Sequence, residues 1–167
     1  MTRRTTTSSD DDADRVARMG TAVMAFVRDF GLLQPDRTPC GKPLTVTQAH
    51  ALAQIAVQPG ISQRDLGAAL GLARASASEL VADLHRRGWL TQTPSDTDRR
   101  QRSLQLTASG HRITNDISDA RSNLMRDLLA DVPADDRARI VAAVELLAAT
   151  AHRYRIRTGE HVETAAS

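Results

Sequence analysis

The chain has 167 residues, of which 41% are hydrophobic but only 2% are aromatic. This length suits a single domain of ordinary size, or a small domain with dimerising extensions. A core with so few aromatic rings must be built from Leu, Ala, Val and Ile, which favours packed helices over an aromatic-rich β-sandwich. The formal net charge of +2 excludes a uniformly basic surface, so the positions of the charges matter more than their sum.

The sequence carries no signal for export or for a membrane. Cys40 is the only cysteine, which excludes an intramolecular disulfide and favours a reducing compartment. The first residues lack the apolar segment of a secretory signal, and no apolar run approaches the ~20 residues of a membrane span. We therefore expect a cytoplasmic protein that does not contact membranes. Residues 1–12 are small, polar and charged, and we interpret them as a disordered tail.

Two helices are predicted before residue 60. Apolar residues recur at helical spacing over 14–33, which predicts an amphipathic helix that ends near Gly31. The three prolines and the glycine that follow predict a loop. A further helix is expected over 45–60, with Thr47 as its cap candidate and Pro59 near its end. The apolar face of the first helix consists of Val16, Met19, Val23, Phe26, Val27 and Phe30.

The next segment has the pattern of a helix-turn-helix. Ser62 and Asp65 have the spacing of a capping box and are expected to start a short helix over 63–70. After a tight turn, a second helix is predicted over 73–87, closed by Gly88 in the left-handed conformation. Such a second helix fits the major groove of duplex DNA, which is about 12 Å wide.

A β-hairpin is expected directly after the second helix. Two short runs of alternating apolar and polar residues flank a charged loop that no core could bury. Leu90, Leu104 and Leu106 are predicted to share the buried face of this hairpin. The residues predicted to point outward are Thr91, Thr93, Ser103 and Gln105.

The charged loop between the two strands has the residue types of a DNA-binding wing. Arg100 is predicted to enter the minor groove, where the electronegative potential attracts arginine. Asp98 can accept hydrogen bonds from the loop or from this arginine and so fix its direction. Arg99 and Arg102 are expected to contact phosphate. Between residues 85 and 102 there are five arginines and two aspartates, a local excess of +3.

Base contacts are expected from the start of the second helix. Small side chains there allow a close approach to base edges, and Arg74 can reach a guanine. The predicted DNA-contacting residues are Gln63, Arg74, Ala75, Ser76, Ser78, Arg86, Asp98, Arg99, Arg100 and Arg102. His85 and His111 are expected to face solvent or phosphate, and Trp89 is interpreted as a packing anchor.

Two long helices are predicted after the hairpin. The first has Thr107 as its cap and is ended by Pro133, and acidic residues fit the first turn of the second. A regular apolar seam with spacings of 4, 3, 4 and 3 follows the second helix. It consists of Ile140, Val144, Leu147, Ala151 and Tyr154.

Residues 44–110 resemble the MarR family of winged-helix transcriptional regulators. The resemblance is carried by an Asp-x-Arg motif in the wing, here Asp98 and Arg100, and by the Leu-Thr-x-x-Gly sequence at 106–110. It implies a homodimer, a pseudo-palindromic operator and release from DNA by a small ligand, often an aromatic compound. Compared with the family, Ala77 replaces a larger β-branched residue, from which we expect looser packing.

The predicted fold is therefore mainly α, of the α+β type. A winged helix-turn-helix domain over 44–107 is flanked by dimerisation segments over 13–43 and 108–157, and a flexible tail is expected over 158–167. The proposed partners are double-stranded DNA, a second copy of the chain and a small-molecule effector. No cofactor and no metal are expected, because no histidine or cysteine pair has ligand spacing.

Effector-binding candidates come from the first two helices. Met19, Val23, Phe26 and Phe30 either form the core face of a dimerising helix, which is the first interpretation, or line a ligand pocket. His50 either contacts a ligand or is a structural residue. Cys40 lies in a loop where Lys42 is the only nearby cation, so an incidental cysteine is favoured over a peroxide-sensing thiol.

The sequence thus predicts a homodimeric, sequence-specific repressor that a small ligand releases from DNA. The alternative is a winged-helix module that binds protein partners without a ligand response. An enzyme is not expected, since no convergent set of nucleophile, base or metal ligands is recognisable.

Overall fold

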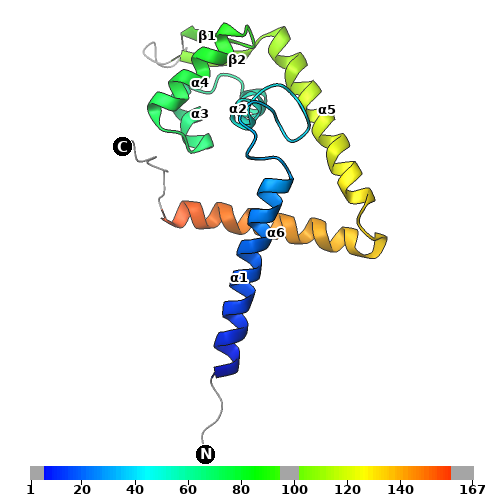
Figure 1. The fold of residues 1–167 in the computed structure, drawn as a ribbon. Coiled ribbons are helices and arrows are strands. Elements are labelled where there is room, and N and C mark those ends of the chain that lie inside the picture. The colour runs from blue at the N-terminus through cyan, green and yellow to red at the C-terminus, as the bar shows by residue number, and fades with distance from the viewer. Residues whose placement is uncertain (1–5, 95–101, 159–167) are drawn as a thin grey trace, which may run out of the picture. The chain divides into compact units, whose positions relative to one another are not determined.

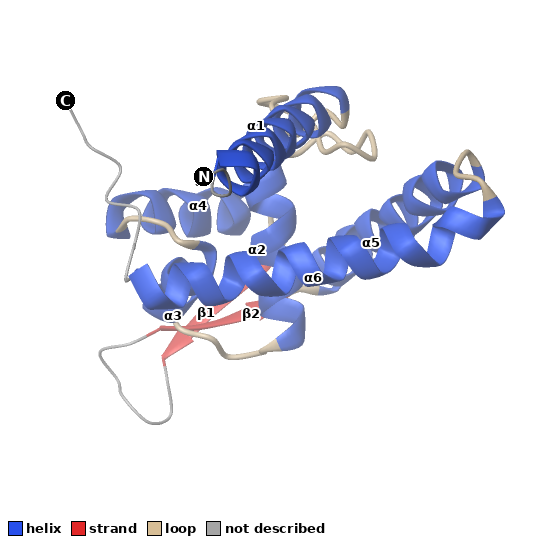
Figure 2. Ribbon diagram, turned by 90° about the horizontal axis from the view of Figure 1, so that it is seen from below, coloured by secondary structure: helices blue, strands red, loops and turns tan. Residues whose placement is uncertain are grey.

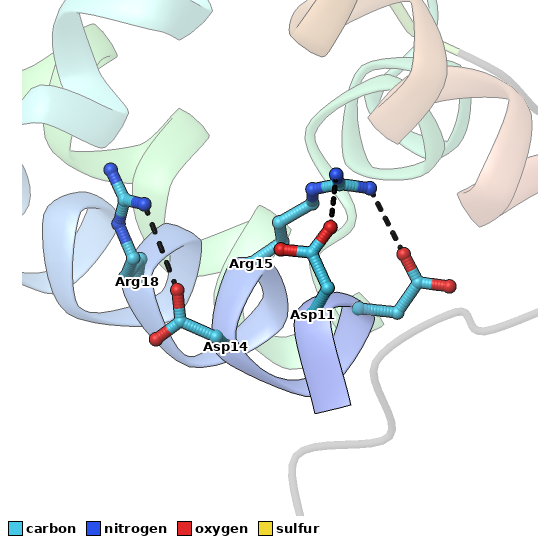
Figure 3. Close-up of polar contacts among 5 residues, drawn as sticks. Asp11, Asp14, Arg15 and Arg18 are labelled. Carbon is cyan, nitrogen blue, oxygen red and sulfur yellow. Dashed lines mark hydrogen bonds and ion pairs between the residues drawn. The ribbon is translucent and has the colours of Figure 1, made fainter. Parts of the chain in front are cut away.

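The first helix, α1 (Thr6–Asp29), begins earlier than the sequence predicted (Figure 1). The computed structural model describes residues 6–94 and 102–158. The expected disordered tail over 1–12 is therefore wrong from Thr6 onward. Ion pairs one helical turn apart stabilise this part of the helix: Arg15 pairs with Asp11 and Asp12, and Arg18 with Asp14 (Figure 3).

The chain divides into two units, Met1–Val46 and Thr47–Ser167. In the first unit, α1 is followed by a turn at Gly31, near where the sequence predicted the helix to end. The loop over 38–42 is closed by hydrogen bonds, because the Thr38 amide donates to the Lys42 carbonyl oxygen at 2.9 Å and the Lys42 amide donates to the Thr38 hydroxyl at 3.0 Å.

The second unit contains the helix-turn-helix. Its elements are α2 (Val46–Val57), α3 (Gln63–Leu70) and α4 (Arg74–Arg86). The start of α2 places Thr47 inside the helix, so the prediction of Thr47 as its cap is wrong. The prediction for α3 is confirmed, since the hydroxyl of Ser62 accepts a hydrogen bond from the Asp65 amide.

The end of α4 also follows its sequence signal. Gly88 has a φ of 71°, in the left-handed region that glycine adopts without strain. Its amide donates to the His85 carbonyl oxygen, and the Trp89 amide donates to the Leu84 carbonyl oxygen, which is the Schellman pattern. The chain therefore leaves α4 at a defined angle and enters the hairpin after three residues.

The wing strands β1 (Leu90–Pro94) and β2 (Arg102–Leu106) pair antiparallel, with Leu90 opposite Leu106 (Figure 2). Leu90 and Leu104 are buried as predicted, whereas Leu106 is only half-buried. The sequence did not predict that the outer edge of β2 is also paired. The segment before α3 hydrogen-bonds there, with Leu104 donating to the Ile61 carbonyl oxygen at 3.0 Å. This pairing attaches the wing to the helix-turn-helix.

The core of this unit lies between the helix-turn-helix and the base of the wing. It is built of aliphatic side chains, as the low aromatic content predicted. Its buried members are Ala51, Leu52, Ile55, Ile61, Leu66, Ala77, Val81, Leu84, Leu90, Leu104 and Ile117.

Two long helices follow the wing, α5 (Ala108–Ala130) and α6 (Ala134–Thr158). The predicted seam of α6 is exposed in the single chain, and none of the residues of α6, all of which are described, is buried. None of the helices in the described ranges is long and apolar enough to cross a membrane.

The first turn of α5 is fitted closely to the end of α4. The Thr107 hydroxyl accepts from the Gly110 amide and donates to the Gly88 carbonyl oxygen, while the Thr107 amide donates to the Trp89 carbonyl oxygen. A Cβ atom at Gly110 would lie 1.9 Å from that Trp89 oxygen. The Leu-Thr-x-x-Gly sequence therefore has a steric cause, because only glycine leaves room for this carbonyl.

We predict that Gly110→Ala lowers the free energy of unfolding by about 3 kcal/mol, since the methyl group meets backbone that cannot move aside. Urea denaturation followed by far-UV circular dichroism measures the change. The matched control is Ser109→Ala in the same helical turn, which is expected to stay within about 0.5 kcal/mol of the wild type. An unchanged urea midpoint for Gly110→Ala would show that the contact is not tight in solution.

Candidate nucleic-acid interface

The outward face of α4 carries the small residues that the sequence singled out. Arg74, Ala75, Ser76 and Ser78 are all exposed, whereas Ala77 is buried on the opposite side of the helix. The residue before α4, Ala73, has an extended backbone and makes no side-chain cap hydrogen bond. The first N–H groups of α4 are therefore not capped by that side chain, an arrangement that suits an anionic acceptor such as a phosphate oxygen.

The inward face of α4 is more tightly packed than expected. Gly67 of α3 is buried against Ala77, and a Cβ atom at Gly67 would lie only 3.0 Å from the Ala77 Cβ. The two small residues let α3 and α4 approach closely. The expectation of looser packing at Ala77 is therefore wrong, because the missing side-chain volume is filled by the neighbouring helix.

A cluster around Asp83 organises the C-terminal end of α4. Its carboxylate accepts hydrogen bonds from Arg86, the last residue of α4, at 2.6 Å and from Arg87, the residue after it, at 2.7 Å. Gln48 of α2 donates to the same carboxylate at 2.7 Å. Asp83 thus joins the last turn of α4 to α2. We refer to Gln48, Asp83, Arg86 and Arg87 as the Asp83 cluster.

The two arginines of this cluster affect the pKa of the Asp83 carboxyl. Partial burial raises the pKa of the Asp83 carboxyl, but hydrogen bonds and positive charge from Arg87 and Arg86 outweigh this effect, so that the pKa is lower than in a free aspartate. The carboxylate therefore remains ionised at neutral pH. Arg87 also lies over the ring of Trp89, with its guanidinium carbon 5.1 Å from the ring centroid.

The side chains of Trp89 and His85, which lie where α4 ends and β1 begins, each contact another residue of the protein. Trp89 is half-buried beneath Arg87, as expected of a packing anchor. His85 Nδ1 lies 3.0 Å from the Leu90 carbonyl oxygen, and since a carbonyl can only accept, Nδ1 donates this hydrogen bond. The ring of His85 therefore ties α4 to β1, in addition to being exposed as predicted; His111 is also exposed.

The remaining predicted DNA contacts are only partly described. Gln63 is half-exposed at the start of α3, and Arg102 is exposed at the start of β2, opposite Pro94. Asp98, Arg99 and Arg100 lie outside the described residues. Arg86 is exposed, but its guanidinium is engaged with Asp83. The structure thus exposes Arg74, Ala75, Ser76 and Ser78 on the outward side of α4 and connects Arg86 to a cluster that the sequence did not predict.

The spacing of the sequence contained a signal for that cluster. Asp83 lies three residues before Arg86 and four before Arg87, which are the separations at which opposite charges meet on a helix. The contact with Gln48 has no such signal, because the two residues are 35 positions apart.

The effector candidates on α1 are largely exposed in the single chain. Met19 and Phe26 are more than half exposed, Val23 is exposed, and the rings of Phe26 and Phe30 stack with their centroids 4.8 Å apart. His50 is exposed on α2. An open hollow of about 520 Å³ in the first unit is lined by Phe30 and by polar residues that include Asp29, Gln34, Asp36 and Arg37.

The only cysteine, Cys40, lies in a hydrogen-bonded loop. The Sγ atom of Cys40 lies 3.1 Å from the Thr38 hydroxyl, within the closed loop over 38–42. In the described ranges, no group of three or more His, Cys, Asp or Glu side chains could hold a metal ion.

A helix-turn-helix followed directly by a two-stranded wing defines a winged helix-turn-helix protein. Residues 42–101 match the model of the MarR family. The Transcriptional repressor MprA of Escherichia coli (strain K12) is 35% identical over 68 residues, which are 41% of this chain and 39% of that protein. The match thus spans about two fifths of the length of the curated relatives.

Solved structures extend the likeness over most of the chain. The PcaV transcriptional regulator from Streptomyces coelicolor has a TM-score of 0.63 and 25% identity, over 80% of this chain and 96% of its own. FabT of Streptococcus pneumoniae, solved in complex with DNA, has a TM-score of 0.65 and 16% identity, over 85% of this chain and 99% of its own. Residues 42–101 are thus similar to the MarR family, and the fold over most of the chain is similar to that of solved transcriptional regulators.

We predict a pH-dependent contribution of Asp83 to stability. Because its pKa is lower in the folded chain than the unfolded value of about 3.9, the contribution is present above that pH and is lost as the pH falls through the folded pKa. The difference in unfolding free energy between the wild type and Asp83→Asn should therefore shrink as the pH falls below about 4. Urea denaturation across this range measures it.

The comparison variant for this pH series is Asp116→Asn, which removes the carboxylate of an exposed residue on α5, outside the Asp83 cluster. It shows how the denaturation curves change when a carboxylate outside the Asp83 cluster is lost. A difference between wild type and Asp83→Asn that stays constant down to the lowest pH would contradict the role of the two arginines.

Proposed function

We propose that the chain is a homodimeric transcriptional repressor that binds a pseudo-palindromic duplex operator. The observation that carries this proposal is the division of α4 into two faces. Ala77, Val81 and Leu84 are buried, while the exposed face presents Arg74 and the small residues that follow it. A face of this kind can enter the major groove without steric hindrance, and Arg74 can form paired hydrogen bonds with a guanine.

The surroundings of α4 supply contacts that do not depend on sequence. Arg86 and Arg87 lie at its C-terminal end and Arg102 at the base of the wing, and all three are exposed. Guanidinium groups next to a recognition helix bind phosphate and fix the register of the helix on the duplex. The arginines at 99 and 100 belong to the same proposed surface, although they lie outside the described residues.

Dimerisation is proposed from the apolar surface of α6. Ile140, Val144, Leu147 and Tyr154 are between 42% and 60% exposed in the single chain and follow one another at helical spacing. A contiguous apolar stripe of this length is unfavourable in water, and the same stripe on a second copy covers it through a twofold contact. Two recognition helices held in this way would meet half-sites about one helical turn, ~34 Å, apart.

Release by a small ligand is the third part of the proposal. The support is indirect: PcaV has been solved in complex with its natural ligand, and that structure has a TM-score of 0.56 and 23% identity to this chain. A ligand that prefers a dimer with a different separation of the two α4 helices would lower operator affinity, typically by about 1–3 kcal/mol. An effector could be sought among aromatic acids with purified dimer and operator.

We predict that Arg74→Ala weakens operator binding by about 1–3 kcal/mol, because a paired contact with a base is lost. The operator would first be selected by the wild-type chain from a random duplex library, and affinities measured by fluorescence anisotropy. The matched control is Arg126→Ala on α5, where the guanidinium contacts Asn123 and no DNA contact is proposed. Equal affinities of Arg74→Ala and wild type would refute this role of α4.

We predict that Leu147→Glu converts the dimer to a monomer, since a charge placed in the apolar stripe loses its hydration when the stripe is covered. Analytical ultracentrifugation at micromolar concentration measures the change. Glu145→Gln, which alters the same helix outside the stripe, should leave the mass unchanged. A wild-type chain that is already monomeric would contradict the proposed dimer. If the wild-type chain binds a protein partner but no DNA duplex, the alternative of a protein-interaction module is favoured.

A further inference from the structure

An acidic side chain lies at the centre of the proposed phosphate-binding surface. Asp83 has a side chain only 23% exposed, and it contacts both Arg86 and Arg87. A carboxylate close to DNA phosphates is normally unfavourable, because like charges repel. The inward side of this part of the helix is made by Val81 and Leu84, and Asp83 is connected to α2 by the hydrogen bond from Gln48.

The geometry of the cluster indicates what the acid does. Arg86 reaches one carboxylate oxygen, and Arg87 and Gln48 reach the other. Gln48 is buried, so the carboxylate is held from α2 as well as from its own helix. Arg87 is restrained a second time by stacking on Trp89. Each of the two flexible arginine side chains thereby has a defined direction.

The same contacts leave both guanidinium groups able to bind an anion. Within the described part of the chain, Asp83 engages one nitrogen of each group, the terminal Nη2 of Arg86 and the Nε of Arg87. A guanidinium carries several further N–H donors in one plane, so a phosphate oxygen can be contacted at the same time. An arginine that is ordered before binding loses less conformational entropy when the complex forms.

We propose that Asp83 is a positioning residue for DNA recognition: it orients Arg86 and Arg87 for phosphate and so fixes the register in which α4 meets the bases. The inference rests on the proposed function, because it requires that α4 binds duplex DNA. It extends that function by assigning sequence specificity to a residue that itself touches no base. An acid that acts only by its charge would instead weaken the binding of every sequence equally.

The test compares the duplex selected by the wild-type chain with a scrambled duplex of the same length. Asp83→Asn keeps the size of the side chain and removes its charge, so it releases both arginines. We expect the ratio of selected to scrambled affinity to fall roughly tenfold, because the register is loosened while phosphate attraction remains. Fluorescence anisotropy at fixed salt measures both affinities.

Two further variants separate positioning from charge. Glu79→Gln removes the same unit of charge from the same helix outside the cluster and should raise both affinities without lowering their ratio. In an Arg86→Ala/Arg87→Ala background, Asp83→Asn should change the ratio less than about twofold, because the groups through which it acts are gone. A tenfold loss that persists in this background would overturn the proposal.

A readout without DNA comes from Trp89, the only tryptophan in the sequence. Because Arg87 covers its ring, Asp83→Asn should make Trp89 more accessible to acrylamide quenching, and Glu79→Gln should not. Unchanged quenching would overturn the positioning of Arg87. If Asp83→Asn does not fold, Asp83→Glu keeps the charge but moves the carboxylate by one methylene group; a ratio equal to that of the wild type would then overturn the inference.

Failure of this inference is distinguishable from failure of the proposed function. A wild-type chain that binds normally, together with an unchanged ratio for Asp83→Asn, overturns the role of Asp83 alone. A wild-type chain that selects no sequence from the library overturns the proposed function and the inference with it.

Discussion

The arrangement of the winged helix-turn-helix unit depends on one close approach of backbone to backbone. The carbonyl group of Trp89 lies against the first turn of α5, where a side chain at Gly110 would overlap it. Thr107 completes the contact, since its amide donates to this carbonyl and its hydroxyl to the preceding one at Gly88. The end of α4, the start of the wing and the start of α5 are thereby joined within a few residues.

This junction determines how the proposed recognition surface is oriented. Because α4 ends in a Schellman turn and β1 begins directly after it, the direction of the wing follows from that of the helix. His85 adds a hydrogen bond between the helix and the strand, and the segment before α3 pairs with the outer edge of β2. A movement of α5 would therefore move the wing and α4 together, which is the connection that a ligand-responsive dimer needs.

The Asp83 cluster is a second contact at the end of α4, and it connects this end to α2. Its strength does not come from the ion pairs alone, because exposed pairs contribute only about 0–1 kcal/mol each. The buried amide of Gln48 and the ring of Trp89 restrict the same groups from other elements of the fold. The side-chain directions of Arg86 and Arg87 are thus determined by the tertiary structure, whereas their positive charge is determined by the sequence.

Local signals in the sequence were sufficient for most of the elements. The capping pair at Ser62 and Asp65, the glycine at 88 and the Thr107 cap each act within a few residues, so α3, the end of α4 and the start of α5 follow from the sequence. The early start of α1 was missed because ion pairs one turn apart outweighed a polar composition that is typical of disorder.

The sequence by itself determined the order of helices and strands, the aliphatic core and the exposed face of α4, because these depend on periodicity and on caps. Only the tertiary structure decided that Gly67 faces Ala77, that Gly110 admits the Trp89 carbonyl and that Gln48 holds Asp83. These contacts join residues from different elements. Their distances depend on how the helices pack, and no local pattern in the chain encodes that packing.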